Sequence, residues 1–307
     1  MKLSELPRPA LERLLRQGEL LLDLPPFVVR LRCDVASVAR DIVSMYGEFE
    51  TCPADAFADF HIEVRREPGL RRWYPPQVRF YFDGQPAFAP LPANQAFAMI
   101  EWGINWCVAA HAHQFLIIHA AVIERGGRAA LLPAPPGSGK STLCAGLVQR
   151  GWRLLSDELA LVDMDSGLVR GMARPVNLKN ASIDVLRAFA PDAVMTPPVP
   201  DTLKGTVALM RPPHDSVRRV REPALPAWVV LPTYAPGSAA VLQPHSPART
   251  FLLMAEQSFN YDIHGVRGFE AMSALLDRCA SFEFSYSDLA DAARVFDQLA
   301  ASAAVAT

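Results

Sequence analysis

Cysteine is scarce in this chain of 307 residues, and long apolar runs are absent from it. The five cysteines show neither the spacing of a metal site nor the paired pattern of a secreted protein, so reduced thiols are expected. No segment has the uninterrupted apolar length of a membrane helix, and residues 1–7 do not begin a signal peptide. We therefore expect a cytoplasmic protein without a membrane partner.

An excess of charge of one sign is also lacking, because 30 lysines and arginines are balanced by 32 aspartates and glutamates. The formal net charge of −2 gives no broad electrostatic reason for binding nucleic acid. Local arginine clusters, such as residues 65–66 and 218–221, are typical of a solvated surface. No nucleic-acid partner is expected.

The chain is long enough for two hydrophobic cores, and its pattern changes near residue 92. Residues 1–92 contain short strands at 27–31 and 77–82, which indicate a small mixed α+β domain. Residues 93–114 are expected to form a connecting helix, in which Trp102 and Trp106 pack in the core. Residues 115–307 alternate strands with helices and therefore predict an α/β domain.

The most informative segment is residues 131–142, Leu-Leu-Pro-Ala-Pro-Pro-Gly-Ser-Gly-Lys-Ser-Thr. A strand at 129–132 leads into a glycine-rich turn and then into a helix, which is the context of a phosphate-binding loop. Gly137 and Gly139 permit the backbone angles that turn successive N–H groups toward an anion, and the helix N-terminus adds positive charge. The residues expected at the nucleotide are Pro136, Gly137, Ser138, Gly139, Lys140, Ser141 and Thr142.

Ala134 stands where the usual motif has its first glycine, and Pro135 favours an extended backbone there. The alternative is a glycine-rich turn that happens to precede an ordinary helix. Because the strand, turn and helix follow one another as the motif requires, we predict binding of ATP. Lys140 would then reach the outer phosphates, and the Ser141 hydroxyl would bind Mg²⁺.

An acidic pair follows the phosphate-binding loop after one helix and one strand. The strand at 153–156 ends in Asp157 and Glu158, 17 residues after Lys140, so that both carboxylates return to the edge of the sheet where the loop lies. Phosphoryl transfer needs a group that orients the acceptor hydroxyl and groups that hold the metal ion. Asp157 is the candidate for the first role and Glu158 for the second; the alternative is an ordinary turn between strands.

His119 interrupts the apolar strand predicted at 115–123. The segment 124–128 predicts a hairpin, which brings His119 alongside the strand that ends at the phosphate-binding loop. A histidine in such a strand is either a core residue with satisfied hydrogen bonds or a member of the site.

These features together resemble the catalytic domain of HPr kinase/phosphorylase, a bacterial P-loop protein-serine kinase whose fold is related to that of phosphoenolpyruvate carboxykinase. The likeness is strong over residues 115–163 and weak elsewhere. It implies a P-loop kinase core in residues 115–307, with His119 near the reacting phosphate and Asp157 as catalytic acid or base. It further implies that Lys140 contacts the phosphates and that Ser141, Asp157 and Glu158 hold Mg²⁺.

Two positions differ from that family. Glu158 stands where the family has a second aspartate, and residues 174–180 stand where it has a glutamate metal ligand. A divergent branch, HprK-related kinase A, is more similar here, because Pro175–Asn180, Lys204–Thr206 and Ser258–Tyr261 resemble segments of that branch. The branch resembles kinases that phosphorylate ribosomally made peptides, and its members are associated with small peptide-binding partner proteins.

Beyond these motifs, residues 196–206 are rich in proline and predict a loop, whose Lys204 either orders over the phosphates or faces solvent. Further elements are predicted as a hairpin at 159–162 and 168–172, strands at 228–231 and 282–286, and helices at 182–189, 247–257, 265–278 and 287–300.

Three functions follow from the sequence. The first is an ATP-dependent kinase that phosphorylates a hydroxyl, with serine as the leading choice, on a peptide or small protein recognised by the N-terminal domain. The second is a nucleotide-gated regulatory or peptide-binding module without turnover, and the third is a small-molecule kinase. The resembled family forms hexamers, but the N-terminal region here does not resemble its counterpart. The sequence therefore leaves open whether this protein forms a homo-oligomer.

Overall fold

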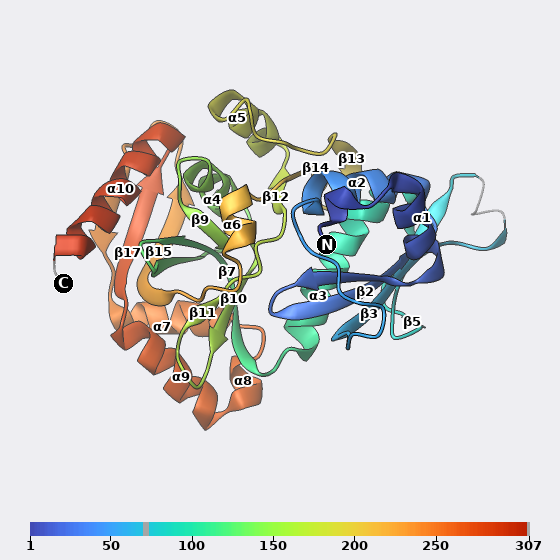
Figure 1. The fold of residues 1–307 in the computed structure, drawn as a ribbon. Coiled ribbons are helices and arrows are strands. Elements are labelled where there is room, and N and C mark those ends of the chain that lie inside the picture. The colour runs from blue at the N-terminus through green and yellow to red at the C-terminus, as the bar shows by residue number, and fades with distance from the viewer. Residues whose placement is uncertain (70–73, 306–307) are drawn as a thin grey trace.

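The computed structural model describes residues 1–69 and 74–305 (Figure 1). These residues form a mixed α/β fold of three sheets with helices packed against them. None of the described helices is long and apolar enough to cross a membrane.

The first sheet belongs to the N-terminal part of the chain, drawn in blue and cyan in Figure 1. Its strands are β1 (Leu20–Leu24), β2 (Phe27–Cys33), β3 (Phe60–Arg66), β4 (Gln77–Phe82), β5 (Gln85–Pro86) and β6 (Leu91–Pro92). They lie in the order β1-β2-β3-β4-β5, with β6 paired to β4. Only β2 and β3 run parallel, because α2 connects them as a crossover.

The helices of this part are η1 (Leu3–Glu5), α1 (Arg8–Gln17), α2 (Ala36–Tyr46), η3 (Ala93–Gln95) and α3 (Ala96–His111). The predicted strands are confirmed, and α3 begins three residues later than the predicted helix. Helices α1 and α2 were not anticipated individually; α1 buries Leu11 and Leu15, one helical turn apart. Helix α3 buries most of its side chains in the N-terminal core.

The prediction that Trp102 and Trp106 pack in the core is wrong in part. Trp106 packs against Phe82 and Phe88 but keeps 37% of its surface exposed. The Lys204 ammonium nitrogen lies over the Trp102 ring, 5.0 Å from its centroid. Trp102 thus contacts a segment that lies about 100 residues further along the chain.

The second sheet forms the centre of the molecule. Its strands are β7 (Phe115–Arg125), β8 (Arg128–Pro133), β9 (Arg153–Ser156), β10 (Leu159–Asp163), β11 (Val169–Arg170), β15 (Leu225–Tyr234), β16 (Val241–Pro244) and β17 (Ala280–Tyr286). The order is β11-β10-β7-β8-β15-β17-β16, and β9 also pairs with β7. Because β8, β15 and β17 run parallel, their carboxyl ends lie at one edge.

Helices cover both faces of this sheet (Figure 1). The helices of this part of the chain are α4 (Lys140–Val148), α5 (Ala181–Phe189), α6 (His214–Arg218), α7 (Pro247–Glu256), α8 (Tyr261–His264), α9 (Val266–Asp277) and α10 (Leu289–Val305). Leu132 of β8 packs in one core with α4 and α10, whereas its neighbour Leu131 packs in another with α7 and α9. This alternation is the strand geometry that a sheet buried on both faces requires.

The third sheet corrects one prediction. It consists of β12 (Val176–Lys179), β13 (Val199–Thr202) and β14 (Gly205–Met210), in the order β12-β14-β13. The segment 196–206 is therefore not a loop throughout, because it contains β13 and the turn to β14. Pro200 is tolerated because β13 lies at the edge of this sheet and is irregularly paired.

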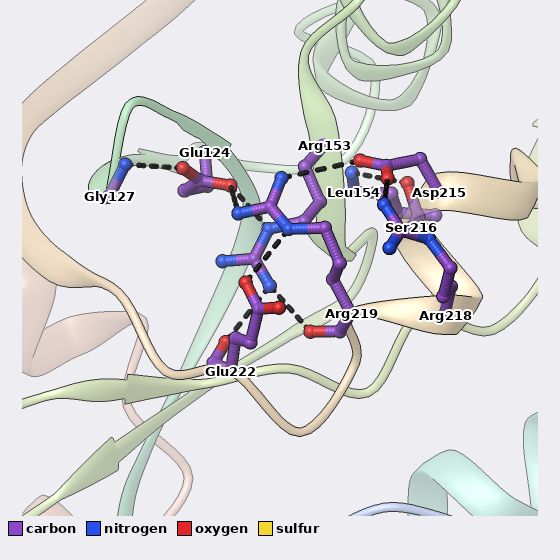
Figure 2. A network of polar contacts seen from close by, with 9 residues as sticks. All are labelled: Glu124, Gly127, Arg153, Leu154, Asp215, Ser216, Arg218, Arg219 and Glu222. Atoms are coloured by element: carbon purple, nitrogen blue, oxygen red, sulfur yellow. Dashed lines mark hydrogen bonds and ion pairs between the residues drawn. The ribbon is translucent and has the colours of Figure 1, made fainter.

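A network of polar contacts centred on one buried ion pair anchors β9 to β7 and to the segment around α6 (Figure 2). The Arg153 guanidinium donates to the Glu124 carboxylate of β7 and to the carbonyl oxygens of Arg219 and Glu222, at 2.7 and 2.9 Å. Arg153 and Glu124 are 4% and 1% exposed. Nearby, the Leu154 amide donates to the Ser216 hydroxyl at 2.9 Å. These contacts connect the segment around α6 to β9, the strand that directly precedes Asp157.

Candidate functional site

The segment between β8 and α4, residues 134–139, is called the glycine loop below. Gly137 and Gly139 have φ angles of +89° and +88°, which only glycine adopts without strain. Ala134, at the position of the usual first glycine, is buried. Neighbouring strands hold the loop, because the Tyr234 amide donates to the Ser138 carbonyl and the Tyr286 hydroxyl donates to that of Gly139, both at 2.9 Å.

The loop ends in a helix whose first N–H groups are free to bind an anion. Among the described residues, nothing accepts a hydrogen bond from the amides of Lys140, Ser141 and Thr142, and Leu143 is the first to donate, to the Gly139 carbonyl. Pro136 lies exposed on the loop, and the Ser141 and Thr142 side chains are half-buried. This geometry favours binding of an anionic ligand at the N-terminus of α4.

His119, Lys140 and Glu158 meet beside the glycine loop. The Lys140 ammonium nitrogen lies 2.9 Å from Nε2 of His119, and this Nε2 atom also lies 3.2 Å from Oε2 of Glu158. The antiparallel pairing of β7 with β10 places His119 opposite Leu159, directly after the acidic pair. The prediction that the hairpin brings His119 alongside the strand that ends at the glycine loop is confirmed, because the next residue, Ala120, pairs with Pro133 at the end of β8.

One ring nitrogen cannot serve both of these contacts in the same way. A charged Lys140 donates to Nε2 only if that nitrogen carries a lone pair, whereas donation to Glu158 requires a proton on it. The histidine can therefore donate to Glu158 only after Lys140 turns away, as it would toward a bound phosphate.

Asp157 lies deeper than the other groups and is 5% exposed. Its Oδ2 accepts a hydrogen bond from the Asn177 amide at 3.0 Å, while its Oδ1 is buried without a partner. Burial and the adjacent Glu158 carboxylate raise the pKa of Asp157 to about 6, against the opposing effects of the Asn177 amide, Lys140 and the Ser141 hydroxyl. A carboxyl group with this pKa can accept a proton near neutral pH.

The pKa of Glu158 moves in the opposite direction. Burial raises it, but the hydrogen bond with His119 and the positive charges of Lys140 and Lys179 together lower it to about 2. Burial lowers the pKa of Lys140, and the two carboxylates oppose that change. The two adjacent acids thus differ in protonation behaviour, which is the arrangement expected of groups with different roles.

Lys204 is not in contact with the glycine loop. It lies in the turn between β13 and β14 with its ammonium over Trp102 of α3. Partial removal from water lowers its pKa, whereas the charge of Glu158 raises it. Lys204 is exposed, as the solvent-facing alternative predicts, although its ammonium lies over an aromatic ring; its ordering over bound phosphates stays a prediction.

The oxygen atoms at the site fit a magnesium ion. Mg²⁺ binds to oxygen ligands, of which one or two carboxylates and the substrate phosphates are usual. Oδ1 of Asp157 and Oδ1 of Asn177 are buried without partners, and the Ser141 hydroxyl lies close enough to Asp157 to affect its pKa. No group of three or more histidine, cysteine or acidic residues that could hold a metal occurs among the described residues. The donor set therefore fits an ion that is completed by substrate and water.

Three residues beside the candidate site were not assigned to it from the sequence. Asn177, Arg174 and Glu101 line a cavity of about 10 Å³ together with Asp157, and α3 forms its other wall. Arg174 lies 3.4 Å from Oε2 of Glu101, and the Tyr46 hydroxyl donates to Oε1 of that glutamate at 2.5 Å. The available signals were a glutamate inside the apolar helix at 93–114 and the position of residues 174–180 where the resembled family has a metal ligand.

A comparison with protein families gives a match to part of the chain. The family model described as SynChlorMet cassette protein ScmC matches residues 93–170, about a quarter of the chain. The matched segment runs from α3 to β11 and includes His119, the glycine loop, Asp157 and Glu158. No curated protein matches the chain.

Proposed function

We propose that this protein is an HPr-kinase-like P-loop phosphotransferase that transfers the γ-phosphoryl group of ATP to a hydroxyl, with serine as the leading acceptor. The observation that carries the proposal is the convergence of four groups at one edge of the central sheet. Lys140, His119, Glu158 and Asp157 come from α4, β7 and the turn between β9 and β10. An anion-binding turn alone would need only the first of them.

The residues divide the reaction as follows. The amides of the glycine loop and the Lys140 ammonium hold the phosphates, and His119, which Lys140 then releases, donates to Glu158. Asp157 accepts the proton of the acceptor hydroxyl while the oxygen of that hydroxyl forms a bond to the γ-phosphorus. The bond from that phosphorus to the β,γ-bridging oxygen breaks, and ADP leaves. A magnesium ion held by Ser141, Asp157 and Glu158 would supply neutralisation of the phosphate charge.

A peptide or small protein is the acceptor that the surface near the site favours. Five large apolar side chains are exposed on α7–α9 and the turn before α8: Leu252, Phe259, Ile263, Val266 and Phe269. The Phe259 ring lies 6.0 Å from that of His119, so this apolar surface begins at the site itself. Exposed apolar surfaces of this kind are typical of protein-binding regions.

The test is phosphoryl transfer from γ-labelled ATP and Mg²⁺ to proteins and peptides in an extract of the host. Asp157→Asn is expected to lower acid-stable labelling by about 10²- to 10⁴-fold, because the proton acceptor is lost. Lys140→Ala is expected to abolish it together with ATP binding. Asp165→Asn, at a side chain that is 89% exposed, is the matched control and should label as the wild type does.

Asn177 favours a second candidate, a nucleotide-gated module without turnover. Asn177 lies in the segment 174–180, which is comparable to the region where the resembled family has a glutamate metal ligand. Its Oδ1 is a neutral amide oxygen, which binds Mg²⁺ less tightly than a carboxylate does. ATP binding that depends on Lys140, combined with no label on any protein, peptide or small molecule, would replace the kinase by this module.

A further inference from the structure

Tyr234 is an exposed aromatic residue beside the glycine loop that the proposed reaction does not use. It is the last residue of β15, and its side chain is 50% exposed. Its own amide donates to the Ser138 carbonyl, so the backbone places the ring in a defined position next to the loop. A Cβ atom on Gly139 would lie 2.9 Å from the Cβ of Tyr234, which shows how closely the two segments approach.

The Tyr234 ring is held from one side only. It packs edge-on against Tyr286, with ring centroids 5.8 Å apart and planes at 70°. Tyr286 is buried and donates its hydroxyl to the Gly139 carbonyl at 2.9 Å. The inner tyrosine therefore supports both the loop and the outer tyrosine, whose remaining surface faces solvent. A supported aromatic face of this kind is suited to stacking.

The order of the strands places Tyr234 away from the reacting groups. His119 lies on β7 and Asp157 follows β9, both on one side of β8, whereas β15 lies on the other side. With strands about 4.8 Å apart, β7 and β15 are separated by about 10 Å across the loop. A nucleotide whose γ-phosphate lies beside Asp157 must extend its other end away from that side, toward β15.

Two hydroxyl groups near Tyr234 have no hydrogen-bond partner among the residues that the structure describes. Oγ of Ser138, in the loop, and Oγ of Ser238, in the turn after β15, are both buried and unbonded. The Ser238 amide donates to the Ala235 carbonyl at 3.0 Å, which keeps this serine close to Tyr234. Polar groups beside an aromatic face are what a nucleoside, with its ring edges and ribose hydroxyls, can use.

We propose that Tyr234 binds the base of a purine nucleoside triphosphate by stacking, an inference that rests on the proposed function. The phosphates lie in the glycine loop, and the base lies over the exposed face of the tyrosine at the end of β15. Recognition of the base by stacking is tolerant of its identity, so ATP and GTP both satisfy it.

The experiment compares the Mg²⁺ complexes of ATP and inorganic tripolyphosphate by isothermal titration calorimetry. Tyr234→Ala is expected to weaken ATP binding by about 5- to 100-fold, the loss of one stacked base. Its tripolyphosphate affinity should stay within about twofold of the wild type, since this ligand has no base. Tyr234→Phe, which keeps the ring, should bind ATP as the wild type does, and Tyr74→Ala, at a tyrosine that is 89% exposed, is the control.

The outcomes separate the two proposals. ATP affinity that is unchanged in Tyr234→Ala would overturn the stacking role while leaving nucleotide binding intact. An equal loss of ATP and tripolyphosphate affinity would also overturn it, because it would assign Tyr234 to support of the loop. A wild-type protein that binds neither ligand would refute the proposed function itself, and the base-binding role with it.

Discussion

At the scale of single residues, the site is built from buried charges whose protonation depends on their neighbours. Asp157 and Glu158 are adjacent in the chain, but the pKa of the first is raised to about 6 and that of the second is lowered to about 2. The difference arises because Glu158 faces His119 and Lys140, whereas Oδ1 of Asp157 has no partner. The two carboxyl groups therefore affect stability with opposite sign.

Asp157→Asn is expected to raise the free energy of unfolding at pH 7.5 by on the order of 2 kcal/mol. Between pH 4 and 6 the folded state binds the Asp157 proton more tightly than the unfolded state, so stability falls as pH rises through this window. The neutral asparagine does not lose stability in this pH range. The difference in the free energy of unfolding between Asp157→Asn and the wild type should therefore vanish near pH 4. Urea unfolding at both pH values measures it.

Glu158→Gln is the matched control for this prediction. Because the pKa of Glu158 is lowered, its ionised carboxylate stabilises the folded state above pH 4.5. This stabilisation is lost as pH falls toward 2. This substitution should therefore destabilise the protein at pH 7.5. If both substitutions changed stability in the same direction, the charge arrangement described above would be wrong.

Gly139→Ala is expected to impair nucleotide binding more than Gly137→Ala does. Both residues have positive φ, so each alanine costs about 1 kcal/mol or more in backbone strain. A Cβ at Gly139 would also lie 2.5 Å from the Tyr286 hydroxyl, whereas a Cβ at Gly137 meets nothing within 4 Å. Titration with MgATP compares the two variants, and equal affinities would contradict the proposed constraint.

At the scale of secondary-structure elements, the central feature is how β9 is held in place. Its strand is four residues long, and the acid that it delivers lies directly after its end. The ion pair of Arg153 with Glu124 joins β9 to β7, and the Arg153 contacts with the Arg219 and Glu222 carbonyls join it to the segment after α6 (Figure 2). A short strand is thereby given a defined position in the sheet.

Arg153→Met is expected to lower the free energy of unfolding by about 3–5 kcal/mol. The substitution keeps much of the apolar stem but leaves the Glu124 carboxylate buried without its closest partner. Arg218→Met, at an exposed arginine paired with exposed Asp215, should change stability by less than about 1 kcal/mol. Urea unfolding of both variants tests the contrast, and similar effects would show that the buried pair contributes little.

At the scale of the whole molecule, a second buried polar network connects the N-terminal part to the site. Tyr46 of α2 donates to Glu101 of α3, and Arg174, three residues before Asn177, lies against that glutamate and contacts Asn105. Burial raises the pKa of Glu101, while Arg174 and Tyr46 lower it. The cavity beside Asp157 is therefore lined jointly by Glu101 and Asn105 of α3 and by residues between positions 156 and 209.

Arg174→Met is expected to destabilise the protein by about 3–5 kcal/mol, because it leaves Glu101 buried without a cation. Adding Glu101→Gln should recover a large part of this loss, since a neutral amide still accepts the Tyr46 hydrogen bond. A double-mutant cycle in urea measures the coupling between the two positions. Additive effects would exclude the connection of the two parts through this pair.

Local patterns in the chain predicted much of the candidate site. The strand, turn and helix from 129 to 148 and the strand at 153–156 are confirmed, because each is defined by residues that are close in sequence. The segment 196–206 was predicted wrongly as a loop, since its strand β13 depends on pairing with β14 rather than on local preference. The domain boundaries at 92 and 114 and the roles of the site residues stay predictions.

The sequence by itself determined which groups can perform chemistry and where the chain must turn, because glycine angles and short hairpins are local properties. Only the tertiary structure decided that Nε2 of His119 lies between Lys140 and Glu158, and that Lys204 lies over Trp102. It alone placed Tyr234, Asn177 and Arg174 around the glycine loop and Asp157. These contacts join residues distant in the chain, and they depend on strand order and burial, which no local pattern encodes.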